Sequence, residues 1–377
     1  MNQPKRVDVY KAYYTCVKNK RNTIPALNFE VNLEKNLEKL YSDLLSGNYK
    51  VGKSSCIVVR ENYKPREIWT GCFRDKIVHH LIYNTLKERY FKKFINNVFN
   101  GIDGRSIYLG ALTARCYAED LTDYGNKKAY YLKADISNFF NSIDKKILFR
   151  IIQRDITDPN EQWLVKLIEK VIFNNPIENP SYAPPKKIRN IVPKNKRLNS
   201  TSIYKGLPIG NLVSQFFSNI YLHELDNFIT NDLHFSPYCR FADDMIFFHE
   251  NPHYLNFIYA QAKKFLHDNL ELELHDKKKC INLIEKGFDF VGYVVKPGRM
   301  YLRTPIREKA LFKIKKWKQL PDKFSETKLE ELRCFINGYL GLAVKVDNYK
   351  YRKKLCLQAA DNPYVSFDNN FSKLILT

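Results

Sequence analysis

The stretch Tyr238-Cys-Arg-Phe-Ala-Asp-Asp-Met-Ile-Phe-Phe248 decides the fold class of this chain. Apolar and aromatic residues fill both of its halves, and two consecutive aspartates, Asp243 and Asp244, lie between them. Two apolar runs joined by a tight acidic turn predict a β-hairpin that presents both carboxylates at its tip. For the pair taken alone, an ordinary Asp-rich turn remains the alternative.

A third acid lies upstream, at the end of another predicted strand. Consecutive carboxylates repel one another, so a cation is expected beside Asp243 and Asp244. Mg²⁺ prefers hard oxygen ligands, and the β-rich run Tyr130–Asp135 ends in a carboxylate that can complete the set. Such a site holds two ions about 3.5–4 Å apart, which activate an attacking hydroxyl and stabilise a leaving pyrophosphate. The three acids therefore indicate nucleotidyl transfer.

The charge of the chain points to a polyanionic partner. Its 62 Lys and Arg residues exceed its 40 Asp and Glu residues, which gives a formal net charge of +22. Nucleic acid is the expected partner, and an anionic membrane is the runner-up. The sequence offers neither an amphipathic anchor nor a long apolar run, so we expect no membrane binding. A merely soluble basic surface stays open as the plain alternative.

The eight cysteines favour a reducing compartment. They are scattered through the sequence without a C-x-x-C pair, which predicts reduced thiols and argues against a zinc site. The N-terminal residues lack the apolar core of a signal peptide. We therefore expect a cytoplasmic protein. Its 377 residues, 44% of them hydrophobic, suffice for two or three subdomains.

The first third of the chain reads mostly helical. Within residues 8–125, apolar residues recur at helical spacing from Leu33 to Leu45. The run Ser55–Arg60 is typical of a strand, and the basic segment Glu61–Arg66 follows it. This order predicts a hairpin with a cationic tip.

The later segments alternate between strand, helix and loop. A helix is expected from Lys145 to Arg154, and the Pro-, Asn- and Lys-rich residues 174–204 predict a long loop or insertion. A glycine-containing turn and a helix through Asp226 precede the acidic hairpin. From Thr304 onward the chain reads as basic helices, which include the segments Lys313–Lys318 and Glu330–Leu342.

Several of these segments resemble the successive palm motifs of reverse transcriptases. In chain order they are Asp135–Phe140, Gly206–Gln215, Phe241–Asp244, Lys277–Lys279 and Gly287–Gly292, with flanking likeness at Pro65–Ile68, Phe73–His80 and Asn337–Gly341. Five motifs in the right order make the resemblance specific, and it covers most of the chain.

The resemblance implies an α+β fold of the right-hand polymerase type. Residues 1–125 correspond to helical fingers with an N-terminal extension. Residues 126–303 correspond to an RRM-like palm, an antiparallel sheet with helices, interrupted by the insertion at about 174–204. Residues 304–377 correspond to a helical thumb.

Among reverse transcriptases, the sequence looks most like the bacterial lineage of diversity-generating retroelements. The segment Gly206-Leu-Pro-Ile-Gly-Asn-Leu-Val-Ser-Gln215 carries this likeness, with Ile209 where retrons and group II introns usually have Gln. Related antiphage reverse transcriptases share the look. The chain departs from the pattern at Phe241-Ala242 and at Asn100–Gly104, which leaves fidelity and template handling open.

The resemblance also implies roles for the catalytic residues. Asp135, Ile136, Asp243 and Asp244 correspond to the ligands of two Mg²⁺ or Mn²⁺ ions. Lys278 corresponds to the residue that donates a proton to the leaving pyrophosphate, although a solvated charge run explains Lys277–Lys279 equally well.

Further residues correspond to positions that handle the nucleotide and the template. Phe140 would exclude a ribose 2′-hydroxyl, although a core position is its alternative. Gly206 and Gly210 would let the backbone approach the nascent base pair. His79 and His80 are expected to pack. The implied nucleotide-binding set is Arg66, Arg74, Phe140, Gly210, Asn211 and Gln215, in which the arginines reach the triphosphate unless they are plain surface residues.

The C-terminal basic helices correspond to a thumb that grips the duplex through its phosphates. The implied nucleic-acid-binding residues are Lys313, Lys316, Trp317 and Arg352 in the thumb, together with Ser214 in the palm, for which a capped helix start is the alternative. No endonuclease motif or zinc cluster accompanies them.

We therefore expect an RNA-directed DNA polymerase that uses dNTPs, an RNA template and a DNA primer or product in a diversity-generating retroelement. An accessory protein or a non-coding RNA is expected beside it, and an oligomer is possible. One alternative is an antiphage enzyme that makes DNA from a non-coding RNA or without a template. Another is a catalytically silent nucleic-acid-binding subunit. An RNA-dependent RNA polymerase is disfavoured by Phe140.

Overall fold

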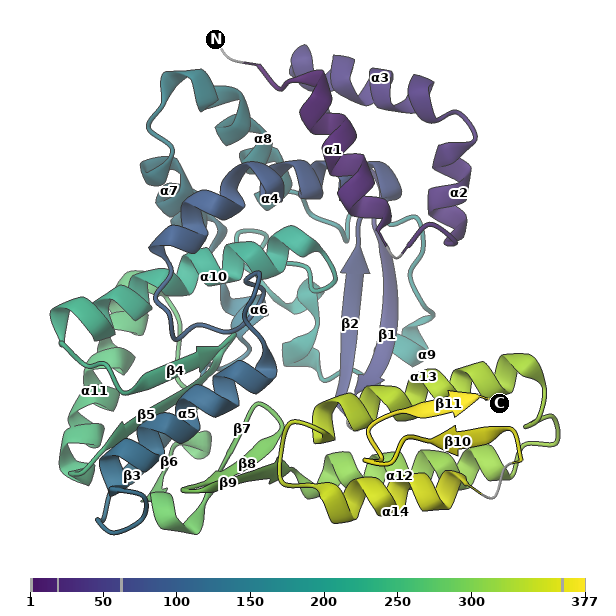
Figure 1. Cartoon of the computed structure of the whole chain (residues 1–377). Helices are drawn as coiled ribbons and strands as arrows, with labels where there is room; N and C mark the ends of the chain where they lie inside the picture. Colours follow the sequence, from purple (N-terminus) through teal and green to yellow (C-terminus); the bar gives the residue numbers. More distant parts are fainter. Residues whose placement is uncertain (1–2, 19, 62–63, 361–362, 377) are drawn as a thin grey trace. The chain divides into compact units, whose positions relative to one another are not determined.

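The computed structural model describes residues 3–18, 20–61, 64–360 and 363–376 (Figure 1). They form two compact units, and neither is one continuous stretch of chain. Unit 1 comprises Met1–Asn96, Asp135–Phe235 and Ala260–Asp276, and unit 2 comprises Asn97–Ala134, Ser236–Tyr259 and Lys277–Thr377. The division into fingers, palm and thumb stays a proposal.

Unit 1 consists mainly of helices. They are α1 (Arg6–Val17), α2 (Ile24–Glu30), α3 (Leu33–Leu45), α4 (Phe73–Lys93), α6 (Phe139–Ser142), α7 (Lys145–Asp155), α8 (Gln162–Ile172), α9 (Lys186–Arg189) and α10 (Leu212–Asn227). The short 3-10 helices η1 (Pro159–Glu161), η2 (Lys194–Lys196) and η3 (Leu198–Ser200) and the π-helix η4 (Phe228–Asp232) accompany them. The predicted helix from Leu33 to Leu45 is confirmed. It forms because Leu37, Leu40 and Leu44 recur on one face, and all three are buried.

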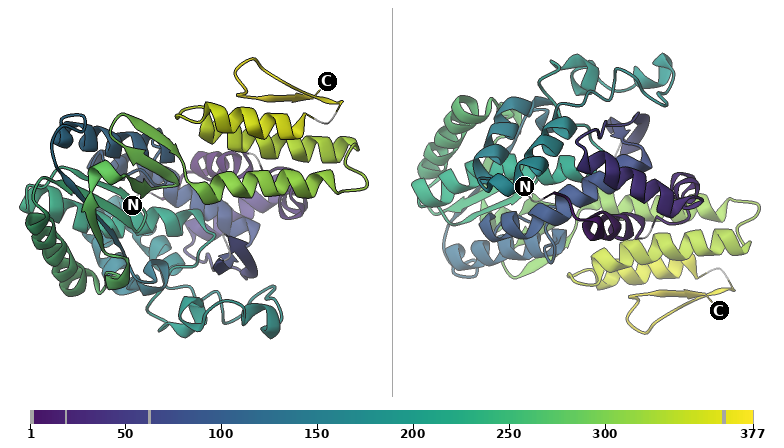
Figure 2. Two further views of the ribbon diagram at one scale, coloured as in Figure 1. Left: turned by 90° about the horizontal axis from the view of Figure 1, so that it is seen from below. Right: turned by 90° about the horizontal axis from the view of Figure 1, so that it is seen from above.

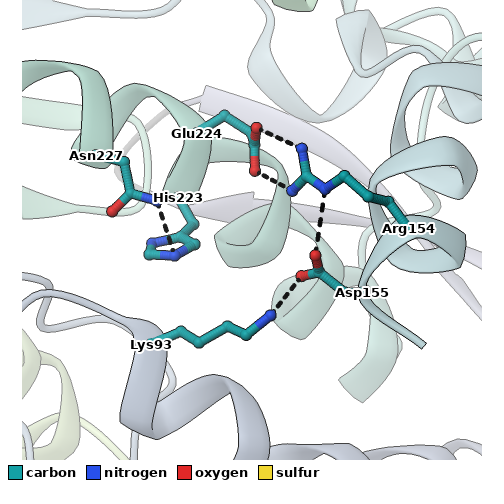
Figure 3. A network of polar contacts seen from close by, with 6 residues as sticks. All are labelled: Lys93, Arg154, Asp155, His223, Glu224 and Asn227. Carbon is teal, nitrogen blue, oxygen red and sulfur yellow. Dashed lines mark hydrogen bonds and ion pairs between the residues drawn. The ribbon is translucent and has the colours of Figure 1, made fainter. Parts of the chain in front are cut away.

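A polar network joins α4, α7 and α10 (Figure 3). Arg154 of α7 donates two hydrogen bonds to the Glu224 carboxylate of α10, at 2.7 and 3.1 Å. Asp155 accepts from Arg154 at 3.3 Å and pairs with Lys93 of α4 at 3.1 Å. On α10, the Asn227 amide lies 3.1 Å from a ring nitrogen of His223. The network fixes the three helices of unit 1 against one another.

The predicted hairpin near the cationic segment is confirmed, but its turn is shorter than predicted. Strand β1 (Ser55–Glu61) pairs antiparallel with β2 (Lys64–Thr70), in a register that runs from Ser55 opposite Thr70 to Glu61 opposite Lys64. Residues 64–66 therefore belong to a strand rather than to the turn, because backbone pairing continues through them. Residues 62–63, at the tip, lie outside the described residues.

Unit 2 contains the acidic hairpin within a four-stranded sheet. Its strands lie in the order β4 (Tyr238–Phe241), β5 (Asp244–His249), β3 (Tyr130–Asp135) and β6 (Cys280–Leu283). Asp135, the last residue of β3, is counted in unit 1, and the other residues of these strands belong to unit 2. The pairs β4·β5 and β3·β6 are antiparallel. The hairpin and the strand predicted at 130–135 are thus confirmed. Helix α5 (Ile107–Thr122), capped by the Ser106 hydroxyl, packs against β4 and β5 (Figure 1).

A second antiparallel sheet and a helical group complete unit 2. The sheet consists of β7 (Phe288–Phe290), β8 (Tyr293–Lys296) and β9 (Arg299–Leu302). The group consists of α12 (Thr304–Lys318), α13 (Glu326–Ala343), α14 (Tyr349–Ala359) and the hairpin of β10 (Val365–Phe367) and β11 (Leu374–Leu376). Figures 1 and 2 show these helices side by side with the hairpin along them. The predicted basic C-terminal helices are confirmed.

The remaining elements connect these parts. Helix α11 (Pro252–Leu270) crosses from unit 2 to unit 1, and η5 (Asp276–Lys278) and η6 (Ile284–Lys286) flank β6. Residues 174–204 contain only the short turns α9, η2 and η3, as expected of a loop, although Val192 and Leu198 are buried. None of the helices in the described part of the chain is both long enough and apolar enough to cross a membrane.

Candidate active site

The acidic turn of the β4–β5 hairpin is built from two residues, Ala242 and Asp243. Phe241 pairs with Asp244 across the hairpin, so the turn has the minimum length that antiparallel strands allow. Ala242 adopts a left-handed conformation, with φ of 55°, which costs a residue with a Cβ free energy. Asp243 is half-buried and Asp244 is exposed, whereas residues 245–248 are all buried. The two acids thus stand at the end of an apolar ribbon.

Arg240 holds this turn in place. It is fully buried, and its Nη1 donates to the Ala242 carbonyl oxygen at 3.1 Å. Its backbone N–H donates to Asn97 O at 2.9 Å, and its carbonyl accepts from Phe99 N–H at 3.0 Å. Arg240 belongs to none of the residues predicted for the site. A cation inside an otherwise apolar strand was the signal that could have identified it.

Asp135 is the last residue of β3, the strand that lies between β5 and β6. Its side chain is buried, with 8% of the residue exposed, and its carbonyl accepts from His275 N–H at 2.8 Å. Ile136, which follows it, is buried and forms a bridge with Leu274. The backbone on both sides of the Asp135 carboxylate is therefore fixed by pairing with the segment after α11.

The donor chemistry of these residues suits Mg²⁺ or Mn²⁺, because Asp135, Asp243 and Asp244 supply hard carboxylate oxygens and no thiol or imidazole competes in their motifs. Among the residues that the structure describes, no group of three or more His, Cys, Asp or Glu side chains is arranged to hold a metal ion. The binding of Mg²⁺ or Mn²⁺ by Asp135, Asp243 and Asp244 is therefore a proposal.

In unit 1, the turn before α10 is attached to β2. Trp69 N–H donates to the Ile209 carbonyl at 2.7 Å. The side-chain amide of Asn211 accepts from Gly71 N–H at 3.1 Å and donates to Trp69 O at 3.3 Å. A Cβ on Gly210, whose φ is 122°, would lie 2.7 Å from Ile68 Cγ2 and 2.9 Å from Trp69 O. Gly210 is therefore required for the close approach of this turn to β2.

Three of the predicted nucleotide-binding side chains reach solvent from unit 1. Gln215 is exposed on α10, and Arg66 is exposed on β2. Phe140 is partly exposed while its neighbour Phe139 is buried, and Leu207 N–H donates to the Phe140 carbonyl at 2.8 Å. These positions leave the Gln215, Arg66 and Phe140 side chains accessible to a ligand.

Ser214 lies on the buried side of α10. It is 3% exposed and lines a pocket with Gly71, Asp75, His79 and Asn211. The Asp75 carboxylate in this pocket accepts from Tyr49 Oη at 2.7 Å and from Gly52 N–H at 2.9 Å. Burial lowers the pKa of His79 to about 3, so its ring is neutral. The prediction that His79 packs is confirmed, and Ser214 lies in the same interior.

Arg74 is engaged by neighbours in unit 1. It pairs with Asp43 at 2.6 Å, and its guanidinium lies 5.0 Å from the centre of the Tyr49 ring. It is nevertheless partly exposed at the start of α4. A triphosphate contact at Arg74 would therefore compete with the Asp43 carboxylate.

The predicted pyrophosphate-binding and nucleic-acid-binding residues of unit 2 divide into exposed and buried groups. Lys278, Lys313 and Lys316 are exposed. Trp317 is buried and donates its indole N–H to Lys328 O at 3.2 Å, and Arg352 is buried and donates to Asn370 O at 2.6 Å. These polar groups are engaged within the helical group, and contact of Trp317 or Arg352 with nucleic acid stays a prediction.

The comparisons with known proteins agree with this architecture. Residues 53–295 match the family described as reverse transcriptase (RNA-dependent DNA polymerase). Since this match covers well over half of the chain, the protein belongs to the reverse transcriptase family, whose members are nucleotidyltransferases. The sequence matches no curated protein.

Two solved telomerases are similar to the chain. Apo telomerase from Candida tropicalis has a TM-score of 0.51 and 11% identity, with 77% of this chain and 52% of that chain covered. Telomerase from Candida albicans in complex with a TWJ fragment of telomeric RNA has a TM-score of 0.43 and 11% identity, with 86% and 64% covered. The first likeness supports the polymerase fold alone, and the α+β fold class predicted from the sequence is confirmed.

Proposed function

We propose that this chain is an RNA-directed DNA polymerase that joins deoxynucleotides by metal-assisted nucleotidyl transfer. The observation that carries the proposal is the two-residue acidic turn at Asp243 and Asp244, held by Arg240, within a reverse transcriptase domain. A turn that keeps a strained alanine beside two carboxylates indicates a functional constraint rather than a loose loop.

The proposed metal ligands are Asp135, Ile136, Asp243 and Asp244. Two Mg²⁺ or Mn²⁺ ions bound there would supply activation of the primer hydroxyl and stabilisation of the leaving pyrophosphate. The three carboxylates would supply the oxygen ligands for those ions, and the pairing of Asp135 and Ile136 with the segment after α11 keeps that part of the site rigid.

Other residues bind and orient the nucleotide. Arg66 and Arg74 would contact the triphosphate oxygens, and Lys278 would donate a proton to the pyrophosphate as it leaves. The partly exposed Phe140 ring would exclude a ribose 2′-hydroxyl by contact. Gly210 and Asn211 fix the turn on β2, and the Asn211 amide is used in that attachment. The exposed Gln215 would therefore be the polar side chain that contacts a base.

The exposed Lys313 and Lys316 would bind phosphates of the template–product duplex, which is recognised by charge and shape rather than by sequence. Their positions on α12 support this role. The Lys313 Nζ lies 4.6 Å from the centre of the Phe335 ring, and the Lys316 Nζ lies 5.1 Å from that of Phe312. Each ammonium thus lies over an aromatic face while its side chain stays exposed to solvent.

For the biological setting, we propose a diversity-generating retroelement. The segment Gly206–Gln215, with Ile209, supports this lineage. An antiphage reverse transcriptase, which would make DNA from a non-coding RNA or without a template, is the alternative that shares these motifs. The proposal includes an accessory protein or a structured RNA as partner. It also includes a cytoplasmic location, which the eight free cysteines favour.

The experiment that tests the activity is primer extension by the purified chain on an RNA template, with labelled dNTPs and Mg²⁺ or Mn²⁺. We expect a labelled product that DNase removes and RNase spares, and that disappears when the metal is chelated. Binding of RNA without any incorporation, under both metals and with co-purified RNA present, would favour a catalytically silent nucleic-acid-binding subunit.

A further inference from the structure

Residues 174–204, which have no counterpart in the proposed chemistry, are anchored to the β1–β2 hairpin. Ser181 N–H donates to Ser54 O at 2.8 Å, and Cys56 N–H donates to Tyr182 O at 2.8 Å. Tyr182 thereby forms a parallel bridge with Ser55, at the edge of β1. The segment therefore extends the hairpin sheet by one bridge.

An ion pair between a buried carboxylate and a partly buried arginine strengthens this attachment. Glu67 of β2 is 4% exposed, and its Oε1 lies 3.6 Å from Arg189 Nε. Its Oε2 accepts from Leu198 N–H at 3.1 Å and from Trp69 Nε1 at 3.3 Å. Around this carboxylate, Cys56, Trp69 and Leu198 form a small apolar core with Ile177 and Ala183. The segment is thus held on the face of β2 opposite to Arg66 and Ile68.

The outer surface of the segment is basic. Residues 174–204 contain six Lys and Arg residues but only one acid, Glu178. Arg189 is bound by Glu67, and Arg197 donates to the Val192 carbonyl and to Asn190. The four lysines, Lys186, Lys187, Lys194 and Lys196, are all exposed. Within the described residues, none of these lysines forms a salt bridge with a carboxylate.

Apolar side chains are exposed among these lysines. Tyr182 is 55% exposed, and Ile188 and Ile191 are 42% and 41% exposed. Cations that neutralise phosphates, beside an exposed aromatic side chain such as Tyr182 on which a base can stack, are the features that bind single-stranded nucleic acid. A duplex would offer phosphates to the lysines but no base faces to Tyr182.

We propose that residues 174–204 form a binding surface for single-stranded RNA, the part of the template that has not yet been copied. The lysines neutralise its phosphates, and Tyr182 contacts its bases. Because Glu67 attaches the segment to β2, RNA bound to the segment is held at a fixed place relative to β2. The identity of the strand as template rests on the proposed function, but the binding itself requires neither dNTPs nor metal.

The test compares two quadruple variants of the full chain. The first carries Lys186→Gln, Lys187→Gln, Lys194→Gln and Lys196→Gln. The control carries Lys11→Gln, Lys35→Gln, Lys39→Gln and Lys50→Gln, which remove the same charge from exposed lysines elsewhere in unit 1. Binding of a fluorescein-labelled oligouridine RNA is measured by anisotropy over a range of salt concentrations, in chelator, and circular dichroism verifies that both variants fold.

We expect the first variant to bind the RNA at least about tenfold more weakly than the control at moderate salt. Its slope of log affinity against log salt should be smaller by about 2–3, since each single-strand phosphate contact contributes about 0.7. Equal affinities and slopes for the two variants would overturn the proposal. The same comparison is made with single-stranded DNA and duplex RNA probes. If the first variant loses affinity only for one of these probes and not for the oligouridine, the proposal is also overturned, because the surface would then bind another nucleic acid.

The same measurement on Asp243→Asn/Asp244→Asn separates this proposal from the proposed function. We expect that variant to bind the oligouridine as tightly as the unaltered chain. If the lysines prove essential for RNA binding while the unaltered chain incorporates no dNTP, the surface stands and the polymerase assignment fails.

Discussion

Phe140 is the residue whose exposure most directly supports a role in substrate selection. Phe139 beside it is buried, so only Phe140 can meet a ligand. We predict that Phe140→Ala lowers the preference for dNTPs over rNTPs by about ten- to a hundredfold, because the contact that rejects a 2′-hydroxyl is lost. The measurement is the ratio of kcat/KM for dTTP and UTP. Phe257→Ala, at an exposed phenylalanine on α11, is the control. An unchanged ratio would show that Phe140 is not a steric gate.

Arg240 is predicted to position the acidic turn rather than to touch the substrate. Arg240→Met should lower kcat about tenfold or more and leave KM for dNTPs nearly unchanged, because the Ala242 carbonyl loses its donor and the turn can relax. Adding Ala242→Gly should recover part of kcat, since glycine adopts positive φ without strain.

The two Arg240 variants also distinguish positioning from folding. If Arg240→Met simply unfolds the chain, its melting temperature collapses and Ala242→Gly brings no recovery. That pattern, or a change confined to KM, would contradict the positioning role.

His79 makes the stability of unit 1 depend on pH. Its pKa is about 3 in the folded state and about 6.5 when unfolded, so the folded state binds fewer protons. Stability is therefore complete above pH 6.5 and falls as the pH drops toward 3. Between pH 7.5 and 5.0 this group should cost about 2 kcal/mol. Urea unfolding should show that the free energy of unfolding of His79→Gln falls less between pH 7.5 and 5.0 than that of the unaltered chain, by this amount. An equal fall in both proteins would refute the role of His79 in the pH dependence.

At the residue scale, the sequence predicted the chemistry of side chains better than their direction. The three aspartates and Phe140 could be chosen because their motifs are specific. Trp317 and Arg352 could not be judged, because a helical pattern of lysines does not show which side of α12 or α14 packs; the structure places both inside. Glu67 was missed because its partners Arg189 and Leu198 are distant in sequence. Arg240 was missed although its partner, the Ala242 carbonyl, lies only two residues further along the chain.

At the scale of elements, the local patterns were sufficient for several helices and strands. The helix Leu33–Leu45 and the hairpin around Asp243 follow from apolar spacing alone. The loop at 174–204 was predicted as an insertion without a core position. Its attachment to β1 and β2 depends on pairing between Tyr182 and Ser55 and on Glu67 with Arg189, which are more than 100 residues apart. No periodicity within the loop encodes such contacts.

A substitution at Glu67 tests whether this residue anchors the loop at 174–204 to β2. Glu67→Gln should destabilise the fold by about 2–3 kcal/mol, because the partly buried Arg189 loses its counter-charge. Trypsin should then cut faster after Lys186 and Lys187. The double variant Glu67→Gln/Arg189→Met should recover much of the lost stability. Glu178→Gln is the matched control, since Glu178 lies in the same loop. Equal stability and cleavage rates in Glu67→Gln and in the control would contradict the anchor.

At the scale of the whole molecule, the net charge of +22 and the reverse transcriptase domain point to the same class of partner. The order of the motifs, rather than composition, allowed the α+β polymerase fold to be predicted. The two compact units could not be predicted, because each is assembled from three separate stretches of chain. Such a division follows from long-range packing, which a linear pattern does not record.

The central claim is that Asp243 and Asp244 are the catalytic carboxylates of a DNA polymerase. The most direct measurement is incorporation of labelled dNTPs, with Mg²⁺ or Mn²⁺, by the unaltered chain and by Asp243→Asn/Asp244→Asn, each with and without co-purified RNA. We predict incorporation by the unaltered chain and a loss of at least about a thousandfold in the variant, with RNA binding retained. Equal incorporation by both proteins would contradict the account.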